Sequence, residues 1–99
     1  MDMQKIELVK EVSQITGFDK DVVLVVIEEL MSDIKTSLAS GENVYLRNFG
    51  TFGVKHRAEK NFHYAPGKYK YLPPHNDAVF IPSKQFMKKV KLSLPVVDE

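Results

Sequence analysis

The segment from residue 22 to residue 38 carries more apolar surface than one short partner helix can cover. One face of an α-helix is indicated by apolar residues that recur at spacings of three and four, namely Val23, Ile27, Leu30, Ile34 and Leu38. Val22 and Val26 widen that face. Because a chain of 99 residues builds only a modest core, we expect the surplus to be buried in a symmetric dimer. The alternative is a monomeric α+β domain with a flexible loop.

The flanking segments predict the rest of the fold. Residues 5–16 have Leu8, Val12 and Ile15 on one helical face, and glycine follows at the C′ position. Short β-prone runs lie at 43–46, 51–54 and 78–81. A final helix is predicted after Pro82, with Ser83 as its N-cap.

The predicted fold class is therefore α+β, with two N-terminal helices, a three-stranded antiparallel sheet with a long protrusion, and a C-terminal helix. We expect a single domain over residues 1–99. Its parts, by approximate residue number, are a helical part at 1–41, the sheet at 42–82 with its protrusion at 55–77, the helix at 83–94 and a tail at 95–99.

The protrusion combines aromatic, basic and proline residues. Within it, residues 56–76 hold four aromatic and four basic residues, namely Phe62, Tyr64, Tyr69, Tyr71, Arg57, Lys60, Lys68 and Lys70. A structureless loop of about 20 residues is unusual inside a compact domain, so this stretch is either a functional extension or disordered. Cross-strand pairing of the aromatic rings would stiffen a ribbon, and one ring near its tip could stack on a base or sugar.

Charge is distributed unevenly although the net charge is only +1. Residues 1–45 carry a net charge of −5, and residues 46–99 carry +6. This asymmetry favours a polyanion-binding surface in the second half, against the alternative of a merely solvated charged face.

Several other classes of function are disfavoured by what the sequence lacks. It has no cysteine, and the spacings of His56, His63 and His75 match no compact metal-ligand pattern, so we expect no metal site. It shows no phosphate-binding glycine loop, nucleophile elbow or paired carboxylates in a plausible pocket, so we expect no enzyme and no cofactor. No segment resembles a membrane span or a signal peptide, and a cytoplasmic protein is the default expectation.

Three phenylalanines and one glycine of the predicted strands and of the turn between the first two carry structural expectations. Phe49, Phe52 and Phe80 are predicted to be core residues that anchor the strands to the helices. Gly50 is predicted to satisfy a backbone φ requirement.

Five short motifs, in order, resemble the HU and integration host factor family of bacterial histone-like DNA-binding proteins. Residues 48–52 (Asn-Phe-Gly-Thr-Phe) resemble the Gly-Phe-Gly-Asn-Phe signature of that family, and residues 55–58 resemble the basic-x-Arg-Ala run that starts its DNA-binding arm. Residues 80–84 (Phe-Ile-Pro-Ser-Lys) resemble its Phe-Lys-Pro-Gly-Lys, while 16–20 and 5–8 resemble its interhelical and opening motifs. The resemblance covers residues 5–91.

This resemblance implies a dimer whose intertwined helices form a base, with two β-ribbon arms that reach around DNA in the minor groove. Each arm tip of the family carries an intercalating proline, and Pro66 is the matching residue here. The family usually has Arg-Asn-Pro where this chain has Tyr64-Ala65-Pro66, and the segment between Phe52 and Phe80 is one residue shorter. The expected DNA-binding residues are Lys5, Lys55, Arg57, Lys60, His63, Tyr64, Pro66, Lys68, Lys70 and Lys84.

The resulting hypothesis is a cytoplasmic, nucleoid-associated protein that binds and bends double-stranded DNA with little sequence preference. Its partners are DNA and a second copy of the chain, or a paralogue in a heterodimer, with no membrane and no small-molecule substrate. Two alternatives stay open. One is a site-selective DNA bender similar to integration host factor, and the other is a structural dimer that uses the arm to bind protein.

Overall fold

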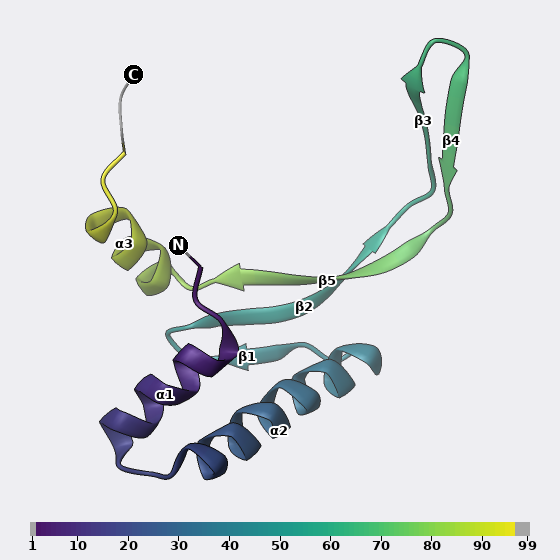
Figure 1. Ribbon diagram of the computed structural model, residues 1–99. Helices are drawn as coiled ribbons and strands as arrows, with labels where there is room; N and C mark the ends of the chain where they lie inside the picture. The colour runs from purple at the N-terminus through teal and green to yellow at the C-terminus, as the bar shows by residue number, and fades with distance from the viewer. Residues whose placement is uncertain (1, 97–99) are drawn as a thin grey trace. The chain divides into compact units, whose positions relative to one another are not determined.

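The computed structural model describes residues 2–96 and consists of three helices and five strands (Figure 1). The chain divides into two compact units, Met1–Thr36 and Ser37–Glu99. Of the predicted tail at 95–99, residues 97–99 lie outside the described part of the chain. Among the described residues, no helix is long and apolar enough to span a membrane.

Two helices form the first unit. Helix α1 (Lys5–Thr16) has the predicted bounds, and α2 spans Lys20–Ala39. The start of α1 is fixed by the Glu7 carboxylate, which accepts a hydrogen bond of 3.1 Å from the backbone N–H of Gln4. Its end is fixed by Gly17, which adopts a left-handed φ of 79° and donates its N–H to the Ser13 carbonyl.

The helical unit leaves most of its apolar surface uncovered. Of the described apolar side chains, those of Val9 and Val23 are buried, at 1% and 5% exposure. The apolar face predicted for α1 is exposed in the single chain, since Ile15 is 84% exposed and Leu8 and Val12 are also open. That prediction identified apolar residues correctly but placed the buried position one residue off, at Leu8 instead of Val9.

The second unit is built on a three-stranded antiparallel sheet, as predicted. Its order is β1 (Val44–Leu46), β2 (Gly50–Arg57) and β5 (His75–Pro82). Helix α3 (Lys84–Ser93) follows β5, and the Ser83 side chain caps it by accepting a 3.1 Å hydrogen bond from the Phe86 N–H. The α+β fold expected from the sequence is therefore confirmed.

Four phenylalanine rings join this sheet to α3. The ring of Phe80 lies 4.8 Å from that of Phe52 and 5.4 Å from that of Phe49, measured between centroids, and Phe86 of α3 lies 5.2 Å from Phe49. The prediction that Phe49 and Phe80 are core residues needs correction, because they remain 45% and 38% exposed in the single chain. The rings cluster together, but the described chain does not cover them.

Gly50 is required for a reason other than the predicted backbone φ. Its φ is not positive; the left-handed residue in this turn is Asn48, with φ of 65°. A Cβ atom on Gly50 would lie 2.6 Å from both the Ile81 carbonyl oxygen and the Phe80 ring. Gly50 therefore permits a close approach of β2 and β5.

A second, two-stranded ribbon extends the β2–β5 pair. It consists of β3 (Lys60–Ala65) and β4 (Lys68–Leu72). Its register continues that of β2–β5, since Arg57 pairs with His75 and, across a gap of two residues on each side, Lys60 pairs with Leu72. The gap contains Pro73 and Pro74, which have no N–H group to donate to a ladder. These prolines account for the break in an otherwise continuous pairing.

Candidate nucleic-acid interface

The tip of the ribbon is a two-residue turn formed by Pro66 and Gly67. Ala65 pairs with Lys68 across this turn, and Gly67 adopts a φ of 72°. Proline followed by a residue with positive φ is the sequence pattern of a type II turn, because proline fixes its own φ and glycine tolerates the left-handed one. The proline thus lies at the outermost, exposed point of the ribbon.

A β-bulge next to the tip places one extra residue, Tyr64, in β3. His63 pairs with Tyr69, and the pairing then shifts by one so that Ala65 faces Lys68. The ring of Tyr64 lies edge-on to that of Phe62, with 6.5 Å between centroids, and remains 61% exposed. The bulge therefore presents an aromatic ring beside the turn that holds Pro66.

The ring of His63 stacks on that of Tyr69 across the ribbon. Their centroids are 4.6 Å apart and their planes differ by 12°. These residues are a directly opposed pair in the register, so the stack ties β3 to β4. The expected pairing among Phe62, Tyr64, Tyr69 and Tyr71 is not observed, because Tyr69 faces His63, Tyr71 faces Asn61 and Phe62 faces Lys70.

A hydrogen bond from Tyr71 to Glu59 reinforces the inner end of the ribbon. The phenol of Tyr71 donates to Glu59 Oε2 at 2.8 Å. This hydrogen bond, with a smaller contribution from burial, raises the pKa of Tyr71 above its ordinary value of 10.0. Glu59 belongs to the segment between β2 and β3, so the bond links that segment to β4.

Where the arm joins the sheet, an acidic residue neutralises the predicted DNA-binding arginine. The Nε atom of Arg57 lies 3.1 Å from Oδ2 of Asp77, and the Nε2 atom of His75 lies 3.3 Å from its Oδ1. Lys55 pairs in register with Asp77, which brings two cations and a histidine around one carboxylate. The side chains of Arg57 and Asp77 are both more than two-fifths exposed, so this is a solvent-accessible cluster.

The structure thus brings together most of the sequence-predicted site residues. The ribbon and its tip hold Lys60, His63, Tyr64, Pro66, Lys68 and Lys70, while Lys55 and Arg57 lie at the end of β2. Lys84 is the first residue of α3. Lys5 belongs to the helical unit, where its Nζ atom lies 2.8 Å from Oε1 of Glu28. Their roles in DNA binding stay predictions.

Sequence reasoning missed Asp77 and Glu59 as parts of this region. Both are the acidic residues of an otherwise basic stretch, and that was the available signal. What the sequence could not show is that each would meet a specific partner, because those partners are 20 and 12 residues away along the chain.

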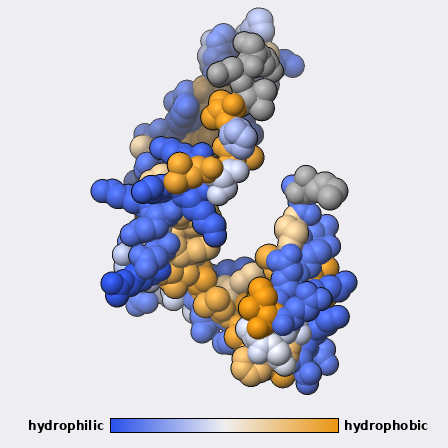
Figure 2. All heavy atoms as spheres, turned by 90° about the vertical axis from the view of Figure 1, so that its left-hand side faces the viewer, coloured by the Kyte–Doolittle hydropathy of each residue, from blue (hydrophilic) through white to orange (hydrophobic). Residues whose placement is uncertain are grey.

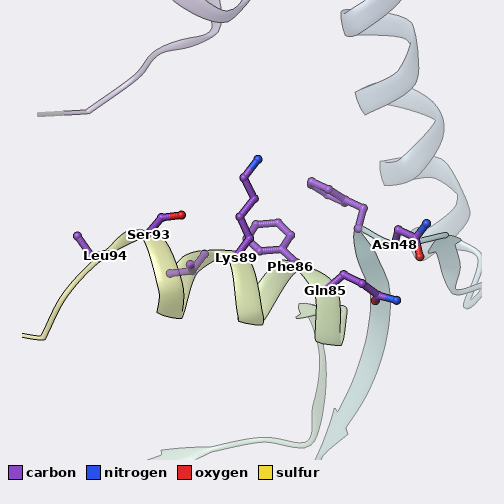
Figure 3. A pocket seen from close by; sticks show the side chains of 8 residues that line it. Asn48, Gln85, Phe86, Lys89, Ser93 and Leu94 are labelled. Atoms are coloured by element: carbon purple, nitrogen blue, oxygen red, sulfur yellow. The ribbon is translucent and has the colours of Figure 1, made fainter.

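An apolar hollow lies beside α3 in the second unit. It encloses about 750 Å³ and is lined by residues of the β1–β2 turn and of α3. Figure 3 shows Phe86 and Lys89 on α3 and Leu94 just after its end, with Asn48 of the turn beside the start of the helix. Val90 and Leu94 in its lining are 45% and 67% exposed. Apolar side chains also reach the surface in patches on the otherwise mostly hydrophilic face seen in Figure 2.

No group of three or more His, Asp or Glu side chains within residues 2–96 is arranged to hold a metal ion. His75 instead contacts Asp77 and the Pro73 carbonyl, and Nδ1 of His56 lies 3.2 Å from Oδ1 of Asn76.

Sequence comparison finds relatives over nearly the whole chain. The family model "Bacterial DNA-binding protein" matches residues 3–91. DNA-binding protein HU of Thermus thermophilus is 34% identical over 88 residues, which cover 88% of this chain and 91% of that protein. Integration host factor subunit alpha of Actinobacillus pleuropneumoniae is 38% identical over 61 residues, which cover 62% of this chain and 59% of that subunit.

Structural comparison gives the same result. The cocrystal structure of Anabaena HU with DNA superposes with a TM-score of 0.83, at 26% identity, over 90% of this chain and 98% of that one. HU from Thermotoga maritima gives a TM-score of 0.63 at 27% identity, over 90% of this chain and all of that one.

Proposed function

We propose that this chain, which belongs to the bacterial DNA-binding protein family of HU and integration host factor, binds double-stranded DNA as a dimer and bends it through its arms. Family membership also supports the expectation that it is not an enzyme, because this family consists of architectural DNA-binding proteins. Its expected location is the cytoplasm, with the nucleoid.

The observation that carries this proposal is the exposed ribbon with Pro66 at its tip. A two-stranded ribbon is a marginal fold by itself, so an arm of this kind gains order when it contacts a ligand. Lysines along it supply phosphate contacts. An apolar wedge at the tip opens a base step, and the cost of unstacking is offset when bent DNA touches more protein.

Dimerisation is supported by the apolar surface that each unit leaves exposed. In the helical unit, Phe18, Val22 and Val26 are 63%, 51% and 62% exposed. In the second unit, the hollow beside α3 is apolar and open. A second copy of the chain would cover surface of this extent, which soluble monomers seldom leave exposed.

A site-selective role remains the second candidate, favoured by the similarity to integration host factor subunit alpha. Such a protein reads the deformability of particular base steps in addition to the phosphate backbone. It would prefer one duplex sequence over others by more than an HU-like protein does.

A salt titration of binding to random-sequence duplex tests the proposed function. We expect the affinity to fall steeply with salt, with a slope corresponding to on the order of 5–10 phosphates per dimer. Competition experiments should give similar affinities for duplexes of unrelated sequence. A slope near zero, or no binding at low salt, would instead favour an arm that binds protein, and a strong preference for one duplex would favour the site-selective candidate.

A further inference from the structure

The distal ribbon has two chemically different faces, as its register shows. Successive side chains of a strand point to opposite faces, and paired residues share a face. Lys60 pairs with Leu72 and Phe62 with Lys70, while Lys68 lies two residues from Lys70. All three lysines of the ribbon therefore lie on one face, which we call the lysine face. The other face holds Asn61, His63, Tyr69 and Tyr71.

The lysine face also carries the apolar side chains of the ribbon. Phe62 and Leu72 are half-buried there, and Tyr64, two residues beyond Phe62 on the same strand, has its exposed ring 6.5 Å from that of Phe62. Because the ribbon is only two strands wide, Phe62 and Leu72 are covered only in part, and Tyr64 is 61% exposed. This face combines cations with partly exposed apolar groups. Such a surface suits the groove of a nucleic acid, where phosphates line both edges and sugars and bases lie between them.

On the opposite face, Tyr69 and Tyr71 are 72% and 53% exposed, but each is engaged in an interaction within the arm. His63 and Tyr69 use their ring faces on each other, and the phenol of Tyr71 is bonded to the Glu59 carboxylate. A carboxylate at this position repels phosphate, and no lysine of the ribbon lies on this face to offset it.

We propose that the arm contacts DNA through the lysine face alone, with Tyr64 as its aromatic contact next to the tip. This inference rests on the proposed function and specifies which side of the arm performs it. The lysines contact phosphates on the rims of the groove, and the rings of Phe62 and Tyr64 lie against sugars or an opened base step. The His63–Tyr69 stack holds the strands together from behind.

A charge transposition across the ribbon tests this. Lys70→Gln removes a cation from the lysine face, and Asn61→Lys adds one to the opposite face, so the double variant keeps the net charge of +1. With two arms per dimer, Lys70→Gln should reduce the salt slope by about two and weaken binding at every duplex sequence. Asn61→Lys alone should leave the slope unchanged, and the double variant should behave like Lys70→Gln.

The aromatic contact is tested by a matched pair of exposed tyrosines. Tyr64→Ala should weaken binding about tenfold, as expected for the loss of a stacking contact. Tyr69→Ala, on the opposite face, should weaken it by less than about threefold, with circular dichroism of each variant as the folding control. Restoration of the parent slope in the charge-transposed double variant, or an equal loss from both tyrosine variants, would overturn the face assignment. Failure of the parent chain to bind any duplex would overturn the proposed function itself.

Discussion

The guanidinium of Arg57 lies 3.1 Å from the carboxylate of Asp77, where the arm leaves the sheet. An exposed ion pair of this kind contributes only about 0–1 kcal/mol to folding. Its larger effect is to make the electrostatic potential at the base of the arm less positive. The Asp77 carboxylate offsets the charge of Arg57 and also lies opposite Lys55 in the register.

Asp77→Asn should therefore strengthen DNA binding. The substitution frees Arg57 and removes a negative charge near the phosphates, so we expect a gain of about three- to tenfold at low salt that fades as salt rises. Fluorescence anisotropy with labelled random duplex measures it. Glu28→Gln, which frees Lys5 in the helical unit, is a control of equal charge change. An equal gain in both variants would mean that net charge, and not position, is responsible.

Folding should depend on dimer formation. Only Val9 and Val23 are buried among the described apolar side chains, which is too small a core for a stable monomer. The melting temperature should then rise with protein concentration, because association stabilises the folded state by mass action. Calorimetry over a hundredfold concentration range, with sedimentation to give the mass, tests this. A sharp unfolding transition whose melting temperature does not change with protein concentration, together with a monomer mass, would contradict the need for a dimer.

Pro66→Ala should reduce bending more than affinity. Opening a base step costs a few kcal/mol, and a rigid apolar ring inserts there with little loss of side-chain entropy. Energy transfer between end labels should show a smaller bend on intact duplex. Binding to nicked or gapped DNA should be less impaired, because less stacking remains to be broken. If the variant bends DNA like its parent while Tyr64→Ala does not, the tyrosine is the wedge.

Gly50→Ala should destabilise the protein. The new methyl group would meet the Ile81 backbone oxygen at 2.6 Å, and backbone cannot yield as a flexible side chain can. We expect a loss of about 1–3 kcal/mol in the free energy of unfolding, measured by urea denaturation. Gly53→Ala on the same strand is the control, since its Cβ would meet only side-chain atoms, those of Asn43 at 3.3 Å and of Val79 at 4.0 Å. Equal losses at both positions would argue against the close approach as the cause.

The ionisation of Tyr71 reports the integrity of the inner ribbon. Since its pKa is raised, the hydrogen bond to Glu59 is fully present below pH 10.0 and is lost as pH rises through the raised value. Glu59→Gln should lower the pKa of Tyr71 toward 10.0, as followed by the ring resonances in an NMR titration. Identical titration curves for parent and variant would show that the bond does not form in solution.

The sequence predicted the order of elements well because each has a local signal. Gly17 ends α1 and Ser83 begins α3, and both effects depend on residues within a single turn. The role of Gly50 could not be predicted, because it depends on the Ile81 backbone and the Phe80 ring, about 30 residues away. The exposure of Phe49 could not be predicted for a related reason, since it depends on how far distant parts of the chain cover the ring.

The candidate site was predictable as a set of residues but not as a surface. Lys60, Lys68 and Lys70 were identified from charge and from the family resemblance, yet their common face follows only from the register of β3 with β4. The bulge at Tyr64 sets which residues of β3 and β4 face each other next to the tip. β3 has one more residue than β4 between the His63–Tyr69 pair and the Ala65–Lys68 pair, and the sequence does not show which residue is left unpaired.

The paired gap in the arm, with Pro73 and Pro74 on one side and Ala58 and Glu59 on the other, removes the same number of residues from each strand. We therefore expect that the distal ribbon could be lengthened, shortened or exchanged as a unit without altering the pairing of β2 with β5. Selection can then remodel the tip that meets the ligand while the sheet and its phenylalanine cluster stay intact. A chimera that carries another relative's distal ribbon, joined at residues 59 and 73, should keep the fold of this chain and acquire the donor's bending behaviour.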